Sequence, residues 1–460
     1  MIPPPGEAVT RLVADHLVTV AAGGDGGHGG SGGDGGAAGS PPGIRVVAGG
    51  AVDIDAIGRI VAVGPPAQLG SGPAPTIVGG LLMPGLVNAH AHTPMTLVRS
   101  VGDGLPLQRW LAEEVWPREG RLTADDVRAG MALGSVEMLL AGVTTSCEMY
   151  FNEEVMVEAV LATGARMVNT PGVISALLPH GDVEPRIERI AAFHRSYDDP
   201  DGRIRVGFAP HSIYDLTPQQ CGEIAARAQA VDALFHIHLD ETRAERELTI
   251  ATYGRSATRL LAEHGALEGR VLAAHGVWLD DDDRRLLAEA GASVAHCPQS
   301  NLKLGSGMAD VAALLAAGVG VGVGTDGPAS NDDLDLWEEL RLTPLLARGL
   351  HHDPGALAVD RAFLLATSDA ARAVGLDDVG WLGPGAWADL VRLDLDVPAF
   401  TPLRPDDLVT QLVFSGGARY VTDVWVAGRP VVVHREIVTV DVEALMADCQ
   451  VRAARLTLDA

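Results

Sequence analysis

The feature that most constrains the fold is an alternation of short apolar runs and longer helical stretches between residues 80 and 384. Helical spacing and Ser, Thr or Asp starts mark these stretches, for example 122–141 and 217–232. Eight apolar runs can be counted: GLLMPGLVNAHAH, GVTTSCEMY, ARMVNTPGVI, RIRVGFAPHS, ALFHIHLDE, RVLAAHGVWL, ASVAHCP and GVGVGVGTD. Strands that alternate with helices predict βαβ units and a parallel sheet. Eight units predict an α/β fold whose main domain is a (β/α)8 TIM-like barrel over residues 83–383.

Both ends of the chain have the pattern of β structure. Residues 9–20 and 44–64 are β-branched, partly alternating runs, and strand-like runs return after residue 384. We therefore expect residues 1–82 and 384–460 to form one small β-sandwich domain beside the barrel. The glycine-rich segment 21–43 cannot bury enough surface to order itself, and it is predicted to be a flexible loop.

Composition excludes several classes of protein. A hydrophobic fraction of 47% over 460 residues excludes a wholly disordered chain. The formal net charge of −26 has the wrong sign for binding nucleic acid or an anionic membrane. The four cysteines lie far apart without a CxxC pair, so neither a disulfide framework nor a zinc finger is predicted. The chain has neither a signal-peptide pattern nor an apolar span of ~20 residues, so we expect a cytoplasmic protein.

Histidines and carboxylates recur where the predicted strands end. His90 and His92 close the run PGLVNAHAH, and residues two apart in a strand share a face, so both imidazoles can bind one metal ion. In FHIHLDET, His236 and His238 also share a face, and we favour His238 as the ligand because of its spacing to Glu241. Alone, the His90 and His92 pair is equally typical of packed histidines, and His238 alone is more typical of a packed core histidine.

Two further strand ends complete an ordered set. His275 ends AAHGVWL, and Asp326 ends the glycine-valine run GVGVGVGTDG, which is typical of a crowded inner strand. Asp326 alone is also typical of a turn aspartate before glycine. All carboxyl ends of barrel strands meet at one rim, where barrel enzymes carry their chemistry. Four strand ends with such side chains predict a metal-dependent hydrolase.

At this point the chain resembles the amidohydrolase superfamily, and within it the methylthioadenosine/S-adenosylhomocysteine deaminase group. The resemblance extends over most of the chain, and triazine hydrolases are close relatives of that group. The segments that carry it are PLQRWLAEEVWPREGRL, EMYFNEE, GFAPHSIY, HIHLDET, HCPQSNLKLGSG, GTDGPASNDDLDLWEELR and PGAWADLVRLDLD.

The resemblance implies a single divalent metal ion, zinc or else iron, with four protein ligands: His90, His92, His238 and Asp326. It implies that Glu241 protonates a ring nitrogen and then passes a proton to the leaving amine. It also implies that His275 and Asp326 orient and deprotonate the attacking water.

Substrate residues follow from the same resemblance. Glu119 matches the position that binds ribose hydroxyls, and a carboxylate suits a vicinal diol. His211 matches a histidine that contacts the purine ring, and Trp110 is expected near the 5′ substituent. An exposed helix-start glutamate, a packed strand-end histidine and a buried aromatic are the structural alternatives.

One position departs from the resemblance. Pro171 stands where members that accept homocysteine carry an arginine, while Arg186 matches a second carboxylate-binding arginine. Loss of one of two arginines that bind a carboxylate together weakens binding of that carboxylate. We therefore expect adenosine, 5′-deoxyadenosine or methylthioadenosine as substrates in preference to S-adenosylhomocysteine.

The resemblance thus implies an aminohydrolase of adenine nucleosides that assembles as a homo-oligomer, and the net charge predicts no nucleic-acid or membrane partner. A hydrolase or deaminase of another heterocycle, of triazine, guanine or pyrimidine type, is the alternative enzyme. A catalytically inactive barrel with a structural or regulatory role is the alternative from another class, although such proteins usually lose metal ligands.

Overall fold

The computed structural model describes residues 8–20 and 43–458. The predicted flexible loop at 21–43 lies, except for Gly43, outside the described residues. Among the described residues, no helix is both long and apolar enough to cross a membrane. All four cysteines are described, and each is buried as a free thiol.

The main domain is α/β with parallel strands. Two four-stranded parallel sheets have the strand orders β12-β10-β9-β8 and β14-β15-β16-β17. Isolated parallel bridges join Phe208 to Phe235 on one side and Ala91 to Asp326 on the other. The strands are β8 (Leu86–Ala91), β9 (Val143–Glu148), β10 (Arg166–Asn169), β12 (Ile204–Val206), β14 (Leu234–Leu239), β15 (Arg270–His275), β16 (Ser293–His296) and β17 (Gly320–Val323), with the short pair β11 (Gly172–Val173) and β13 (Ala209–Pro210).

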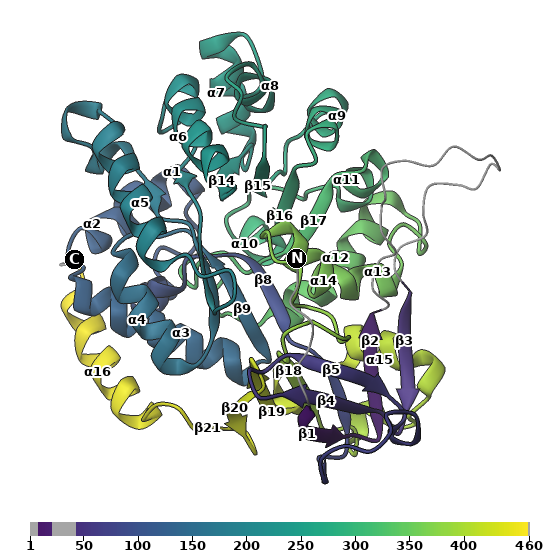
Figure 1. The fold of residues 1–460 in the computed structure, drawn as a ribbon. Coiled ribbons are helices and arrows are strands. Elements are labelled where there is room, and N and C mark those ends of the chain that lie inside the picture. Colours follow the sequence, from purple (N-terminus) through teal and green to yellow (C-terminus); the bar gives the residue numbers. More distant parts are fainter. Residues whose placement is uncertain (1–7, 21–42, 459–460) are drawn as a thin grey trace.

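Helices follow the strands and lie outside them (Figure 1). The predicted helical stretches 122–141 and 217–232 are confirmed, since α3 and α6 begin directly after Thr123 and Thr217, each of which forms a capping box. The helices are α3 (Ala124–Leu140), α4 (Glu153–Thr163), α5 (Glu184–Tyr197), α6 (Pro218–Ala230), α7 (Arg243–Tyr253), α8 (Ala257–Glu263), α9 (Asp281–Glu289), α10 (Pro298–Lys303), α11 (Val311–Ala317), α12 (Leu336–His351), α13 (Val359–Leu365) and α14 (Ser368–Ala373).

Strand β17 is as crowded as its glycine-valine alternation predicts. A Cβ on Gly322 would lie 2.8 Å from the Ala89 Cβ and 3.0 Å from the Ala370 Cα, and one on Gly324 would lie 2.7 Å from the His90 backbone nitrogen. Such approaches are too close for any side chain. The glycines therefore allow β17 to lie against β8, so that the Asp326 side chain reaches the histidines.

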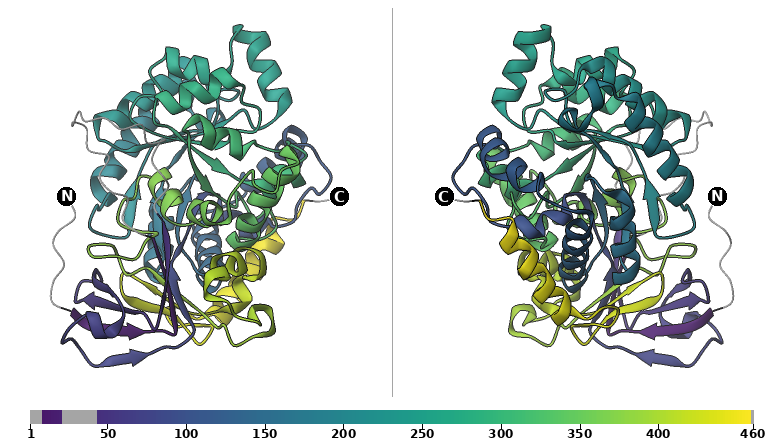
Figure 2. Two further views of the ribbon diagram at one scale, coloured as in Figure 1. Left: turned by 90° about the vertical axis from the view of Figure 1, so that its right-hand side faces the viewer. Right: turned by 90° about the vertical axis from the view of Figure 1, so that its left-hand side faces the viewer.

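Strands from both ends of the chain pair in one sheet. A seven-stranded sheet has the order β21-β20-β19-β18-β7-β2-β3, and β18 pairs antiparallel with β7. A four-stranded sheet, β5-β4-β1-β6, contains N-terminal strands alone, and Figure 2 shows these beside the C-terminal strands. The strands are β1 (Ala8–Val13), β2 (His16–Val20), β3 (Ile44–Ala48), β4 (Ala51–Asp55), β5 (Ile60–Gly64), β6 (Pro75–Ile77), β7 (Leu81–Pro84), β18 (Leu390–Leu393), β19 (Val421–Val426), β20 (Arg429–Val433) and β21 (Glu436–Ile437).

The C-terminal segment also contains the helices α15 (Leu408–Ser415) and α16 (Val442–Arg455). Helix α16 packs against α3, away from the sheets, where Arg452 donates to the Asp126 carboxylate at 3.0 Å and Arg455 pairs with the same group. Asp126 is fully buried, and although burial raises its pKa, the hydrogen bonds from Thr123 and Arg452 outweigh this and lower it. The segment predicted as β structure therefore also contributes a helix to the main domain.

Candidate active site

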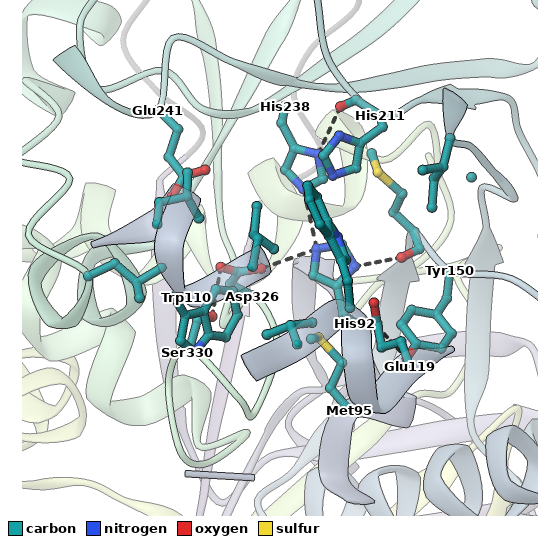
Figure 3. A pocket seen from close by; sticks show the side chains of 18 of the residues that line it. His92, Met95, Trp110, Glu119, Tyr150, His211, His238, Glu241, Asp326 and Ser330 are labelled. Atoms are coloured by element: carbon teal, nitrogen blue, oxygen red, sulfur yellow. Dashed lines mark hydrogen bonds and ion pairs between the residues drawn. The ribbon is translucent and has the colours of Figure 1, made fainter. Parts of the chain in front are cut away.

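One pocket opens where the parallel strands end. His92 directly follows β8, His275 ends β15 and Asp326 follows β17. His238 lies on β14, and Glu241 follows that strand. Figure 3 shows His92, His238 and Asp326 pointing toward one another. The structure thus brings together side chains from four separate strands, as the motifs predict.

The backbone is strained at this rim. His275 and Asp326 have φ angles of 73° and 62°, and Asp240, beside Glu241, has a φ of 45°. Left-handed conformations of residues other than glycine cost of order 1–3 kcal/mol and cluster at functional sites. The side chains of His275 and Asp326 line the pocket, whereas the Asp240 carboxylate accepts from Arg246 at 2.9 Å.

Ligand atoms for a metal ion converge beneath the pocket. His90, His92 and His238 each offer a nitrogen within 4.8 Å of the others, and His90, His275 and Asp326 form a second such group. The Asp326 Oδ1 lies 3.4 Å from the His90 Nε2 and 3.2 Å from the His92 Nε2. Imidazole nitrogens with one carboxylate oxygen are a ligand set that suits zinc and ferrous iron.

Hydrogen bonds to the main chain orient two of these rings. The His92 Nδ1 lies 2.5 Å from the Met149 carbonyl oxygen, and the His238 Nδ1 lies 2.9 Å from that of His211. A carbonyl oxygen only accepts, so both Nδ1 atoms carry protons and both rings direct their Nε2 atoms into the site. These two Nε2 atoms lie 3.2 Å apart, and a cation between them relieves their repulsion.

His90 is fully buried, and its Nε2 has no hydrogen-bond partner. Burial lowers the pKa of His90 to about 3 and that of His238 well below its usual range, so both rings are neutral. For His92, the hydrogen bond and charge of Asp326 outweigh burial and raise the pKa. A neutral buried nitrogen without a partner fits a metal ligand, because such an atom is otherwise costly to bury.

The Asp326 carboxylate is held by two serines. Ser300 and Ser330 donate to its Oδ2 at 2.6 and 2.9 Å, which leaves Oδ1 directed at the histidines. Burial acts to raise the pKa of Asp326, but the nearby imidazole rings of His90 and His92 outweigh this and lower it well below its usual range. Asp326 is therefore an anion, as a metal ligand must be.

Glu241 and His275 face each other across the pocket. The Glu241 Oε2 lies 3.7 Å from the His275 Nε2, and Ser306 donates to Oε1 at 3.2 Å. The His275 Nδ1 lies 2.9 Å from the Asn301 Oδ1, which orients the ring. Burial raises the pKa of Glu241, and a carboxyl group with a raised pKa is suited to giving and taking protons near neutral pH.

Three of the predicted substrate residues also line the pocket, namely Glu119, His211 and Trp110. Tyr150 donates from its hydroxyl to the Glu119 Oε1 at 2.6 Å. Burial raises the pKa of Glu119, and Tyr150 opposes that shift. Burial also lowers the pKa of His211 to about 4, so this ring is neutral.

Arg186 lies outside the residues that line the pocket. Its guanidinium donates to both Glu153 carboxylate oxygens, at 2.8 and 3.3 Å, and to the Gly172 carbonyl at 3.2 Å. Gly172 itself lines the pocket, so Arg186 supports the wall from behind. A role for Arg186 toward a substrate carboxylate stays a prediction.

One end of the pocket is apolar. A short helical segment forms it, comprising α1 (Leu107–Trp110), the π-helical turn Leu111–Val115 and α2 (Trp116–Glu119). Inserted π turns occur frequently at functional sites. The apolar side chains of this segment at the pocket are Leu107, Trp110, Leu111, Val115 and Trp116.

Sequence reasoning did not single out the residues that orient the site. Tyr150, Ser300, Asn301 and Ser330 hold the polar groups of the pocket, and all four stand in segments that carry the family resemblance. Their place in those segments was the available signal. His236 was considered either as a ligand or as a packed histidine. It packs behind the site, where its Nε2 lies 2.9 Å from the His90 Nδ1.

The fold and these residues define the class of the protein. The chain belongs to the amidohydrolase family, whose model matches residues 81–431.

Three of the proteins that this chain resembles are deaminases by name. A 5-methylthioadenosine/S-adenosylhomocysteine deaminase of Dictyoglomus thermophilum is 40% identical over 377 residues, 82% of this chain and 87% of the relative. A 5′-deoxyadenosine deaminase of Methanothermobacter thermautotrophicus is 39% identical over 85% of this chain and 91% of its own length. A zinc-bound adenosine deaminase structure from Xanthomonas campestris has a TM-score of 0.88 and 34% identity, covering 98% of this chain and 99% of that one.

Proposed function

We propose that this protein is a metal-dependent aminohydrolase that converts adenine nucleosides and water into the hypoxanthine analogues and ammonia. The observation that carries the proposal is one pocket in which Glu241, the histidine–aspartate cluster and Glu119 all face the same space. Relatives that are about 40% identical and named as deaminases of such nucleosides support the same reaction.

The proposed metal ligands are His90, His92, His238 and Asp326, and zinc is the proposed ion. The unpartnered Nε2 of His90 and the facing Nε2 atoms of His92 and His238 support this set. When bound, a divalent cation supplies the acidity that makes water a nucleophile near neutral pH.

Three side chains move protons in the proposed reaction. His275 and Asp326 orient the attacking water and accept its proton. Glu241 gives a proton to a nitrogen of the purine ring beside the amino-bearing carbon, and later passes one to the departing amine. The raised pKa of Glu241 supports this role, because the carboxyl must exist in both protonation states near neutral pH.

Nucleoside recognition is proposed for the other side of the pocket. Glu119, oriented by Tyr150, accepts hydrogen bonds from the two ribose hydroxyls. The neutral ring of His211 contacts the purine. Trp110 and its apolar neighbours contact the 5′ substituent, which favours 5′-deoxyadenosine, methylthioadenosine and adenosine. Pro171 offers no guanidinium, Arg186 is paired with Glu153, and the described residues that line the pocket include no arginine. S-adenosylhomocysteine is therefore proposed as a poorer substrate.

The fold proposed for this chemistry is a closed (β/α)8 barrel over residues 83–383 with a β-sandwich from residues 1–82 and 384–460. The parallel bridges at both edges of the two sheets support closure. The apolar cluster that includes Leu12, Leu17 and Leu390 supports packing of the two terminal sheets on each other. Assembly into a homo-oligomer and a cytoplasmic location stay predictions.

A substrate panel tests the proposal. Zinc-loaded protein is incubated with adenosine, 5′-deoxyadenosine, methylthioadenosine, S-adenosylhomocysteine, guanine, cytosine and an aminotriazine, and released ammonia is measured. We expect ammonia from the first three compounds and little from S-adenosylhomocysteine. Ammonia only from the free bases or the triazine overturns the nucleoside assignment in favour of another heterocycle.

A further inference from the structure

We propose that His236 is a positioning residue that, together with Thr170, holds the proton of His90 on Nδ1 and so leaves Nε2 free to bind a metal ion. The inference rests on the proposed metal site. It concerns three groups behind that site, and none of them is among the residues that line the pocket.

These groups form a continuous chain of short contacts. The His90 Nδ1 lies 2.9 Å from the His236 Nε2, and the His236 Nδ1 lies 2.9 Å from the Thr170 Oγ1. Thr170 Oγ1 in turn lies 2.8 Å from the Glu148 carbonyl oxygen. His90, His236 and Thr170 are each 0% exposed, so solvent does not supply alternative partners.

The last acceptor, the Glu148 carbonyl oxygen, determines which group donates in each hydrogen bond of this series. The Glu148 carbonyl only accepts, so the single Thr170 hydroxyl proton satisfies this contact and Oγ1 accepts from the His236 Nδ1–H. The neutral His236 ring then has a bare Nε2, which accepts the Nδ1–H of His90. In this arrangement every one of the three contacts contains one proton.

The opposite direction loses the 2.8 Å contact between Thr170 and the Glu148 carbonyl, and the contact it gains, between the His90 Nε2 and the Asp326 Oδ1, is longer at 3.4 Å. If Thr170 donated to the His236 Nδ1, its Oγ1 would face the Glu148 carbonyl oxygen at 2.8 Å with no proton between them. His236 would then donate to His90, and the His90 Nε2 would carry a proton toward the metal position. Cys147 Sγ, 3.7 Å from the His236 Nδ1, is a weaker partner than Thr170 Oγ1.

His90 needs this longer chain because its partner differs from those of the other ligands. His92 and His238 donate directly to carbonyl oxygens, which permit one proton position. A histidine partner can donate or accept a hydrogen bond. His236 therefore fixes the proton position on His90 only when the proton on its own second nitrogen, Nδ1, is fixed as well. Outer-shell partners of this kind commonly set the tautomer and basicity of a metal ligand.

The first test needs no substitution and no metal. A neutron crystal structure of the metal-free protein locates the exchanged deuterons on the imidazole rings. We expect deuterons on the Nδ1 atoms of both His90 and His236, and one on Thr170 Oγ1 directed at the Glu148 carbonyl. A deuteron on the His236 Nε2 overturns the proposal.

The second test measures zinc affinity, by competition with a chelator, in a matched pair of variants. Thr170→Val keeps the shape but removes the acceptor, so that His236 no longer has a preferred tautomer. We expect about 10- to 100-fold weaker zinc binding, the usual effect of losing an outer-shell partner. Thr170→Ser keeps the hydroxyl and is expected to bind zinc as the unaltered protein does.

Two results separate this inference from the proposal on which it rests. Equal zinc affinity of Thr170→Val and Thr170→Ser, at equal thermal stability, overturns the role of the chain. Failure of the unaltered protein to bind zinc instead overturns the proposed metal site, since the neutron structure reads the proton positions without metal.

Discussion

The two ends of the active-site pocket are built in different ways. At the histidine end, side chains from separate strands converge, and each donor nitrogen or carboxylate oxygen has a second partner that sets its direction. The other end comes from one short helical segment of residues 107–119, whose pocket-facing side chains are mostly apolar. There, Trp110 donates to the Val101 carbonyl at 2.9 Å, and Tyr150 donates to Glu119.

The difference indicates which end sets the chemistry and which end sets the choice of substrate. Hydrogen bonds are directional and expensive to leave unmade, so the histidine end tolerates little change. Apolar packing depends mainly on volume and tolerates substitution more easily. We therefore expect substitutions at the histidine end to abolish turnover and substitutions at the helical end to change KM and substrate preference.

Glu241→Gln, at the histidine end, is expected to have the largest effect on turnover. A small effect would contradict the idea that this end sets the chemistry. The amide cannot pass a proton, so kcat should fall by about 10²- to 10⁴-fold while zinc content is unchanged. Steady-state kinetics and metal analysis check both points. The exposed Glu247, on the helix α7 that follows, offers a matched control in Glu247→Gln, which should be fully active. Turnover of Glu241→Gln near the control's rate removes the proton-transfer role.

Glu119→Ala tests the ribose assignment at the helical end. Hydrogen bonds to charged groups contribute about 1.5–3 kcal/mol, so KM for adenosine should rise roughly 10- to 100-fold. The KM or Ki of free adenine, which has no ribose, should barely change. Glu113→Ala removes an exposed glutamate of the same segment and is the matched control. An equal loss for adenosine and adenine contradicts the assignment.

Trp110→Ala probes the apolar contact with the 5′ substituent. Removing an apolar wall around a small group should reduce the preference for methylthioadenosine over adenosine by about 10-fold in kcat/KM. The ratio of the two substrates corrects for any general loss of active protein. Trp110→Phe, which keeps an aromatic ring, should retain most of the preference. An unchanged ratio in Trp110→Ala would place the substituent elsewhere.

Tyr150→Phe tests the helical end through the pH dependence of KM. Of the four substitutions, it should have the smallest effect on kinetics. Glu119 must be ionised to accept from a diol, burial raises its pKa, and the Tyr150 hydroxyl opposes that rise. Without the hydroxyl the pKa rises further, so nucleoside affinity is lost at a higher pH as the solution is acidified. A net hydrogen bond contributes about 1 kcal/mol, or roughly 5-fold in KM. Identical KM–pH profiles in both proteins would contradict this link.

The motifs that follow strand ends were the most informative part of the sequence. His92, His238, Glu241, His275 and Asp326 all line the pocket in which they were expected. Periodicity and turn chemistry are local properties, so the alternation of strands and helices was readable without contacts. The glycine-valine run also predicted the crowding of β17, because only glycine permits such close approach.

The positions of Arg186 and α16 were not readable in this way. The guanidinium of Arg186 pairs with Glu153, a contact between α5 and α4 that depends on how the helices pack. Helix α16 lies in a segment with a strand-like beginning, and its ion pairs with the buried Asp126 on α3 join residues more than 300 positions apart. Local patterns carry no information about such contacts.

The sequence alone therefore determined the βα alternation, the set of chemistry-bearing residues and their order along the chain. Tertiary structure decided which nitrogen of each histidine faces the site, because those choices depend on carbonyl and hydroxyl groups supplied by neighbouring strands. It also decided that Glu119 and Glu241 share one pocket. Distances between strands arise only when the chain folds and brings the two sheets together, and the direction of each hydrogen bond follows from that packing.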